Sequence, residues 1–530
     1  ASVGGTATLS ADVDVTTLAV DNTVANVAFT GNGSSVVNAI AFANDGTLTL
    51  GTSGGTQTYN GGLNTASVGG TVTLNGSIVT SNDAVVLGAV TLGSATTVDT
   101  NSSDTTGDIT IGAVTGGSNS LTLSTGNNVA NTDISASGAI SGVTTLTLSD
   151  VGGTATLSAD VDVTTLVVGN TVANVAFTGN GSSVTNAISF ANDGTLTLGT
   201  SGGTQTYNGG LTTTAVGGTV TLNGTIASSD DAVVLGAITL GSATVIDTNS
   251  TTTNRADITI AAVTGGSNTL TLTTENNVTG SDVTASGNIS GVTTLTLASV
   301  GGTATLSADV DVTTLVVGNT VANVAFTGNG SSVTNAISFA NDGTLTLGQD
   351  GGTQTYNGGL TTTSVGGTVT LNGTIASSND VLTFGAITLG NNVTIDTNAT
   401  DGTGDITIAA VTGGSNTLTL TTENNIANAD ITASGAIAGV TTLTLANVGG
   451  TATLSADVDV TTLVVGNTVA NVAFTGNGSS VTNAISFAND GTLTLGTSGG
   501  TQTYNGGLTT TSVGGTVTLN GTIASSDDAV

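Results

Sequence analysis

Almost every side chain in this sequence that could do chemistry is a carboxylate. The chain has 34 Asp and Glu residues, one basic residue, Arg255, and no His, Cys or Lys. General bases and nucleophiles are drawn mostly from His, Cys and Lys, or from a carboxylate whose pKa is raised in an apolar pocket. Arg255 is replaced by Thr106 and Thr403 in the corresponding copies of a repeat described below. We therefore expect no catalytic residues and no enzymatic activity.

One carboxylate pattern recurs along the chain, in the sequence SADVDV. Two carboxylates about 7 Å apart on one face of a strand could share a Ca²⁺ ion with oxygens of a neighbouring segment. They could equally be solvated charges that keep chains apart, and their spacing does not match a known calcium loop. Calcium is the one cofactor hypothesis that the sequence offers, and no other metal or cofactor is expected. Its candidate ligands are Asp12, Asp14, Asp160, Asp162, Asp309, Asp311, Asp457 and Asp459.

Aromatic residues are few, and four tyrosines occur at one fixed place in the sequence TQTYNGG. An exposed ring there could stack on a glycan, but packing against the Gly-rich turn that follows is the favoured interpretation. Phe29 and Phe42 are expected to fill the core. Asn44-Asp45-Gly46 is expected to be a tight turn, because Asn and Asp tolerate left-handed backbone and Gly adopts positive φ without strain. The tyrosines are Tyr59, Tyr207, Tyr356 and Tyr504.

These residues recur because the chain is a tandem array. A stretch of 49 residues is identical letter for letter at 151–199, 300–348 and 448–496, and 3–51 is a near copy. Self-similarity at a fixed period of about 148 residues indicates an array whose units bury their apolar faces against one another. The units are 1–150, 151–299, 300–447 and 448–530, with no linker between them, and the chain is expected to be a piece of a longer run.

Each unit consists of short stretches of alternating apolar and polar residues bounded by Gly, Asn, Asp and Ser. This is typical of strands and turns. In Thr47-Leu48-Thr49-Leu50 the leucines face one side and the threonines the other, so that one side is buried and one solvated. Expected strands in the first unit are 6–9, 13–20, 24–29, 36–42, 47–50, 71–78, 84–92, 108–111, 121–123 and 144–148.

Two all-β architectures fit this pattern. Tandem β-sandwich domains would each need their own core, and they usually carry Trp, Tyr or Cys markers and Pro-bearing linkers. The chain has no Trp, Cys or Pro. A parallel β-solenoid, with about seven coils of about 21 residues per unit and roughly 25 coils in all, needs neither. We therefore predict a parallel β-solenoid, with tandem β-sandwiches as the alternative.

Composition excludes several classes of protein. The net charge of −33 rules out binding to the phosphate backbone of nucleic acids, which needs clustered Lys and Arg. No apolar run approaches the roughly 20 residues of a transmembrane helix. The absence of Cys and Met removes the oxidisable sulfurs, and trypsin-like proteases find almost no cleavage sites. These features suit an extracellular or cell-surface location.

The phrases GDITIGAVTGGSNSLTLSTGNN (107–128) and SGAISGVTTLTL (137–148) resemble giant bacterial surface proteins. These are the β-strand-repeat and filamentous-haemagglutinin-like adhesins, and the similarity covers essentially the whole chain. The resemblance implies a secreted, elongated shaft that is a right-handed β-helix, with roles in adhesion, sheaths or filaments. The expected function is the shaft of a self-assembling surface filament or sheath. The expected partners are copies of the chain itself and cell-surface glycans. The alternatives are a non-polymerising adhesin stalk and a calcium-dependent surface-layer protein.

Overall fold

The computed structural model describes residues 2–251, 255–526 and 528–530. Within these ranges every regular element is a β-strand, and the strands pair in parallel as a β-solenoid of about 25 turns. The predicted all-β solenoid is therefore confirmed, and the β-sandwich alternative is wrong. The right-handed winding stays a prediction. The described residues include no helix that could cross a membrane.

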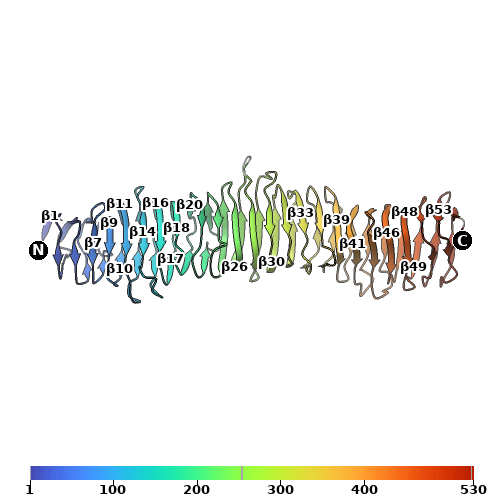
Figure 1. Cartoon of the computed structure of the whole chain (residues 1–530), viewed down its shortest axis with the longest axis horizontal. Helices are drawn as coiled ribbons and strands as arrows, with labels where there is room; N and C mark the ends of the chain where they lie inside the picture. Colours follow the sequence, from blue (N-terminus) through green and yellow to red (C-terminus); the bar gives the residue numbers. More distant parts are fainter. Residues whose placement is uncertain (1, 252–254, 527) are drawn as a thin grey trace. The chain divides into compact units, whose positions relative to one another are not determined.

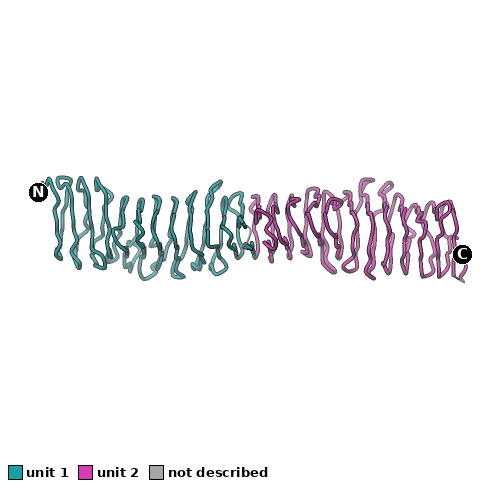
Figure 2. Tube along the Cα trace, turned by 90° about the horizontal axis from the view of Figure 1, so that it is seen from above, with its two compact units in different colours: residues 1–261 teal, residues 262–530 magenta. Residues whose placement is uncertain are grey.

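The chain divides into two compact units, residues 1–261 and 262–530 (Figure 2). In each unit the strands lie side by side like the turns of a spring (Figure 1). The first repeat, at the start of the first unit, contains sixteen strands. Their bounds are β1 Val3–Leu9, β2 Asp14–Val15, β3 Val24–Phe29, β4 Ser35–Val36, β5 Ile40–Ala41, β6 Leu48–Leu50, β7 Thr56–Tyr59, β8 Leu63–Asn64, β9 Val72–Val79, β10 Val85–Leu87, β11 Val90–Asp99, β12 Ile109–Ile111, β13 Val114–Thr115, β14 Leu121–Ser124, β15 Ile134–Ala136 and β16 Ile140–Ser149.

A coil consists of three strand positions, and equivalent positions of successive coils pair to form three columns. In the second coil these positions are β3, β4 and β5, which pair with β6, β7 and β8 of the third coil. Coil length varies along the chain: the coil that separates Val72 from its partner Val90 is shorter than the coil that separates Val114 from Ile140. Turns and bulges of different size absorb this variation while the columns stay continuous.

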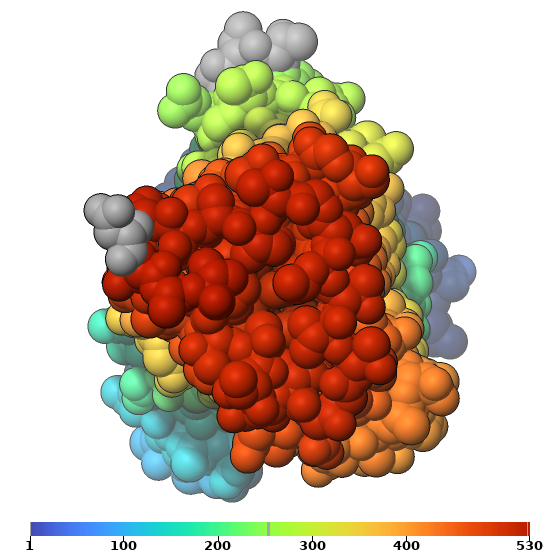
Figure 3. Space-filling view, turned by 90° about the vertical axis from the view of Figure 1, so that its right-hand side faces the viewer, coloured from blue at the N-terminus to red at the C-terminus, as the bar shows by residue number. Residues whose placement is uncertain are grey.

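The core lies inside the coils and consists of stacked aliphatic side chains. In β9 the residues alternate between buried and half-buried along the whole strand, as a period of two requires. Leu48 stacks on Val72 in the next coil, and both side chains are at most 2% exposed. In the space-filling view of Figure 3, the C-terminal end of the chain shows no opening into the interior. The small Val, Leu and Ile side chains therefore make a narrow, solid interior.

One sequence repeat does not contain a whole number of coils. β19 (Asn174–Phe177) carries the same residues as the second half of β3, yet it belongs to the column of β5. From β5 this column runs through β8, β10, β12, β15 and β17 (Thr154–Leu157) to β19, six coils later. β19 therefore lies six coils and two strand positions after β3. A repeat therefore spans six and two-thirds coils, in agreement with the predicted number of about seven.

In the second unit, corresponding strands of consecutive repeats are also separated by six and two-thirds coils. β33 (Asn323–Phe326) shares a coil with β35 (Ile337–Ser338), and the copy of β33 in the next repeat is β49 (Asn471–Phe474). The column of β35 reaches β49 after six coils. Corresponding residues of consecutive repeats within a unit therefore lie on neighbouring faces of the solenoid. The strands between β35 and β49 in this column are β38 Leu360–Thr361, β40 Leu382–Phe384, β42 Ile406–Ile408, β45 Ile431–Ala433 and β47 Thr451–Leu454.

Candidate functional site

The Asp pairs proposed as calcium ligands are split by the fold. Asp160 lies in the turn before β18 (Val161–Val168), and Asp162 lies exposed on the strand. The expectation that both carboxylates project from one strand face is wrong, because the strand begins only after the first of them. The same holds for the other pairs: Asp12, Asp309 and Asp457 precede a strand that contains Asp14, Asp311 and Asp459.

The first Asp of each pair joins two coils. Asp160 Oδ1 accepts a hydrogen bond of 2.7 Å from the backbone N–H of Gly181, one coil further on. In the other three pairs, Oδ1 of the first Asp accepts an equivalent bond of 2.6 to 2.7 Å from a glycine N–H. The pairs are Asp12 with Gly33, Asp309 with Gly330 and Asp457 with Gly478. Among the described residues no group of three or more His, Cys, Asp or Glu side chains could hold a metal ion together. The calcium hypothesis stays a prediction. In each pair, one carboxylate oxygen of the first Asp already accepts a hydrogen bond from a glycine N–H.

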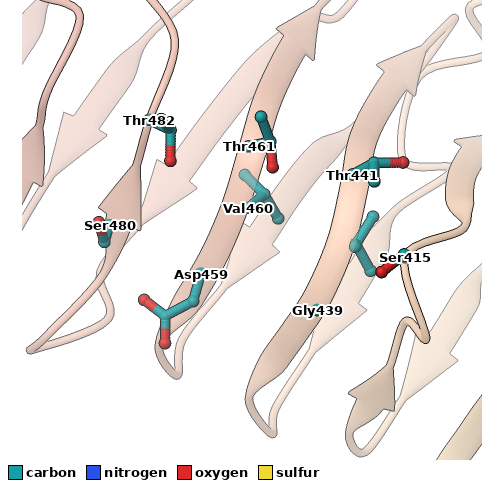
Figure 4. Close-up of a pocket in the computed structure, with 9 residues that line it drawn as sticks. Ser415, Gly439, Thr441, Asp459, Val460, Thr461, Ser480 and Thr482 are labelled. Atoms are coloured by element: carbon teal, nitrogen blue, oxygen red, sulfur yellow. The ribbon is translucent and has the colours of Figure 1, made fainter.

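The second Asp of three of the pairs, at Asp162, Asp311 and Asp459, lies in a shallow trough. One trough, shown in Figure 4, crosses β46 (Ile437–Ala446), β48 (Val458–Val465) and β50 (Ser480–Val481) and has a volume of about 450 Å³. Val440 and Val460, each at most 5% exposed, form its floor. Its walls carry one carboxylate and five hydroxyl groups, from Asp459, Ser415, Thr441, Thr461, Ser480 and Thr482.

A β-bulge produces this concave surface. The pairing of β46 with β48 shifts register between Ala438 and Val440, and Gly439 between them has a φ of 71°. A bulge bends its strand and increases the local twist. Here β46 and β48 each continue through the bend from one column into the next. The corner is therefore made by bent strands rather than by a protruding loop, which leaves it open.

Two further troughs have the same residue types at all nine lining positions. They surround Asp162 in the first unit and Asp311 in the second, with a volume of about 300 Å³ each. Gly142 and Gly291 stand at the bulges, each with a φ of 67°. Sequence reasoning missed the troughs, because each one is assembled from the end of one repeat and the start of the next.

The four tyrosines lie in the core, so the hypothesis of a glycan stacked on their rings is wrong. Packing of the rings over the Gly-rich turn stays a prediction. Tyr59 is fully buried, and burial raises the pKa of its hydroxyl far above the ordinary value. The Tyr59 hydroxyl donates to Gln57 Oε1 at 2.8 Å, and Gln57 Nε2 donates to the carbonyl oxygen of Phe29 at 2.8 Å. Phe29 and Phe42 are fully buried, which confirms them as core residues.

The Asn-Asp-Gly segment forms the expected tight turn and has an additional feature. The Asn44 side chain is fully buried, and its amide nitrogen donates to the carbonyl oxygens of Gly46 and Thr47 at 3.0 and 2.9 Å. Its Oδ1 has no hydrogen-bond partner, as is also true of the corresponding residues Asn192, Asn341 and Asn489. The turn is thus held by a buried side chain, while Asp45 remains exposed.

Several carboxylates outside the Asp pairs have a perturbed pKa, and the rise is large at Asp396. Burial of Asp396, at the end of β41 (Ile387–Asp396), raises the pKa of its carboxyl to about 6. The backbone N–H of Asn398, which donates to Asp396 Oδ1 at 2.8 Å, lowers this pKa, and the negative charge of Glu423 raises it. Because its carboxylate is committed to the backbone of its own turn, Asp396 is a titrating structural group.

The sequence was compared with known proteins. It matches no family model, and neither a curated protein nor a solved structure is significantly similar to it. The solenoid fold therefore stands on the pairing of the strands alone.

Proposed function

We propose that this protein is a structural extracellular rod, the shaft of a self-assembling bacterial surface filament or sheath. The observation that carries the proposal is the continuity of the parallel ladders within each unit. Within a unit, successive coils are joined at three strand positions, as β3, β4 and β5 are joined to β6, β7 and β8, and hydrogen bonds between neighbouring strands run along the solenoid axis. An axial force is therefore shared by the hydrogen bonds of three strands at each step.

Side chains add further bonds between coils. Besides the Asp–Gly bonds, Asn174 Oδ1 accepts from the backbone N–H of Thr195 at 2.9 Å, and Asn186 Nδ2 donates to Thr165 Oγ1 at 2.8 Å. Each of these bonds spans 21 residues, which is one coil. Such bridges stiffen the stack beyond what backbone pairing provides, which suits a mechanical element.

The surface supports an extracellular location. Thr, Ser and Asn cover the outside, and the net charge of −33 keeps such chains soluble and apart until a contact forms. Copies of the chain are the proposed partners. The resemblance of the segments 107–128 and 137–148 to the shafts of bacterial adhesins supports the same role.

Electron microscopy of the purified protein, without partners, tests the proposal. Long, ordered fibres containing many chains are expected. Isolated single-chain particles of one length would overturn self-assembly and favour a non-polymerising adhesin stalk. If ordered assemblies form and then dissolve in a chelator, the calcium-dependent surface layer takes the place of the filament shaft.

A further inference from the structure

Each of the troughs around Asp162, Asp311 and Asp459 contains one exposed carboxylate. The first Asp of each pair is bonded to a glycine N–H, but among the described residues nothing hydrogen-bonds the second. Asp459 lines the same trough as the hydroxyl-bearing residues Thr461 and Ser480 (Figure 4). An ionised carboxylate offers only acceptors, whereas each hydroxyl offers one donor and two acceptors.

The floor of each trough is apolar. Val440 and Val460 lie beneath the hydroxyl groups and are 2% and 5% exposed. A ligand that fits this arrangement has vicinal hydroxyl groups to donate to the carboxylate and is small enough to lie above the buried valines. It must also be uncharged or cationic, because the nearest fixed charge is negative and the chain has one basic residue, Arg255.

We propose that each trough binds one short neutral oligosaccharide. Sugar hydroxyls donate to the Asp carboxylate in a charge-assisted pair of hydrogen bonds, and the Thr and Ser hydroxyls complete the network. A volume of about 300 to 450 Å³ favours a ligand of this size over a single ammonium group or metal ion. No aromatic residue lines the troughs, so binding to each one is weak.

The number of coils in each repeat determines how far apart the troughs lie and which faces of the solenoid they occupy. In the second unit, the troughs at Asp311 and Asp459 are one repeat apart. Six and two-thirds coils place them about 32 Å apart along the axis, at about 4.8 Å per coil. They also lie on neighbouring faces, so one short oligosaccharide cannot reach both. Each trough therefore acts as an independent site, and each of the three lies where two consecutive repeats meet.

Methyl NMR of the full chain, titrated with cellotriose, tests this inference. The floor valines Val163, Val312 and Val460 should shift together and saturate at three ligands per chain. The variant Asp459→Asn should weaken binding at Val460 about tenfold and leave Val163 and Val312 unchanged. The control variant Asp490→Asn makes the same charge change at an exposed turn outside the troughs, and it should alter none of the three.

Two outcomes would overturn the inference. One is the absence of any shift of the floor valines at high millimolar cellotriose in a protein whose methyl spectrum is otherwise that of the folded chain. The other is a response of the same valines to spermidine or Ca²⁺ but not to cellotriose, which would make the troughs cation sites. Neither outcome depends on whether the chains assemble, so the test is separate from that of the proposed filament.

Discussion

The side-chain amide of Gln205 donates a 2.8 Å hydrogen bond to the backbone carbonyl oxygen of Phe177, 28 residues earlier. Gln205 Oε1 in turn accepts from the hydroxyl of Tyr207 at 2.9 Å, and all three side chains are at most 1% exposed. This buried chain of hydrogen bonds recurs in every repeat, at Gln57, Gln354 and Gln502. It fixes a large aromatic ring inside a narrow solenoid, where an unpaired hydroxyl would be costly.

The variant Gln205→Leu should destabilise its coils by about 2 kcal/mol, because the Tyr207 hydroxyl loses its acceptor and the Phe177 carbonyl loses a donor. The double variant Gln205→Leu/Tyr207→Phe should recover part of this loss, since the orphaned hydroxyl is gone. Amide hydrogen exchange of residues 175–177 and 204–207 measures the local free energy of opening. Equal destabilisation in the single and double variants would contradict the coupling.

Substitution of two glycines with positive φ distinguishes the energetic cost of left-handed backbone from the cost of a steric clash. An added Cβ at Gly224, whose φ is 65°, would collide with the carbonyl oxygen of Thr200, whereas one at Gly202, whose φ is 75°, would meet nothing within 4 Å. We expect Gly202→Ala to cost about 1 kcal/mol, the penalty of left-handed backbone. Gly224→Ala should cost clearly more, because the neighbouring coil must also shift. Urea denaturation of both variants compares them, and similar losses would show that the coils separate easily.

The two aspartates of a pair should contribute differently to stability. Asp160→Ala removes the bond to the Gly181 N–H and should cost about 1 kcal/mol. Asp162→Ala removes an exposed carboxylate with no such bond and should leave thermal stability nearly unchanged. Thermal denaturation with and without calcium or a chelator measures both effects. A large stabilisation by calcium that either variant abolishes would establish the paired-carboxylate site instead.

Asp396 should make stability depend on pH in the weakly acidic range. The pKa of its carboxyl is about 6 in the folded protein, against an unperturbed value near 3.9. Between these values the folded state binds more protons than the unfolded state, so this group stabilises the fold increasingly as pH falls from about 6 to about 4. Asp396→Asn should remove that component. The difference in unfolding free energy between wild type and variant, followed from pH 4 to 7, measures it, and a constant difference would refute the assignment.

Much of the local structure could be predicted from alternation alone. The strand predicted at 24–29 is β3, and its first residue, Val24, pairs with Val3 in the coil before, as the predicted stacking of coils requires. The strand predicted at 36–42 is interrupted, because the chain turns a corner between β4 and β5. β7 was missed because its sequence, TQTY, buries Gln57 and Tyr59 and looks polar.

The sequence by itself determined that this chain is all-β, repetitive and almost devoid of the side chains that catalysis uses, because alternation, turn residues and composition are local properties. Only the tertiary structure decided which coil each strand joins, since coils of unequal length sum to six and two-thirds per repeat through bulges and turns far apart in sequence. The burial of the tyrosines, the different environments of Asp160 and Asp162 and the troughs at repeat junctions were likewise decided by the tertiary structure. They depend on contacts between residues about one coil or more apart, which no local pattern encodes.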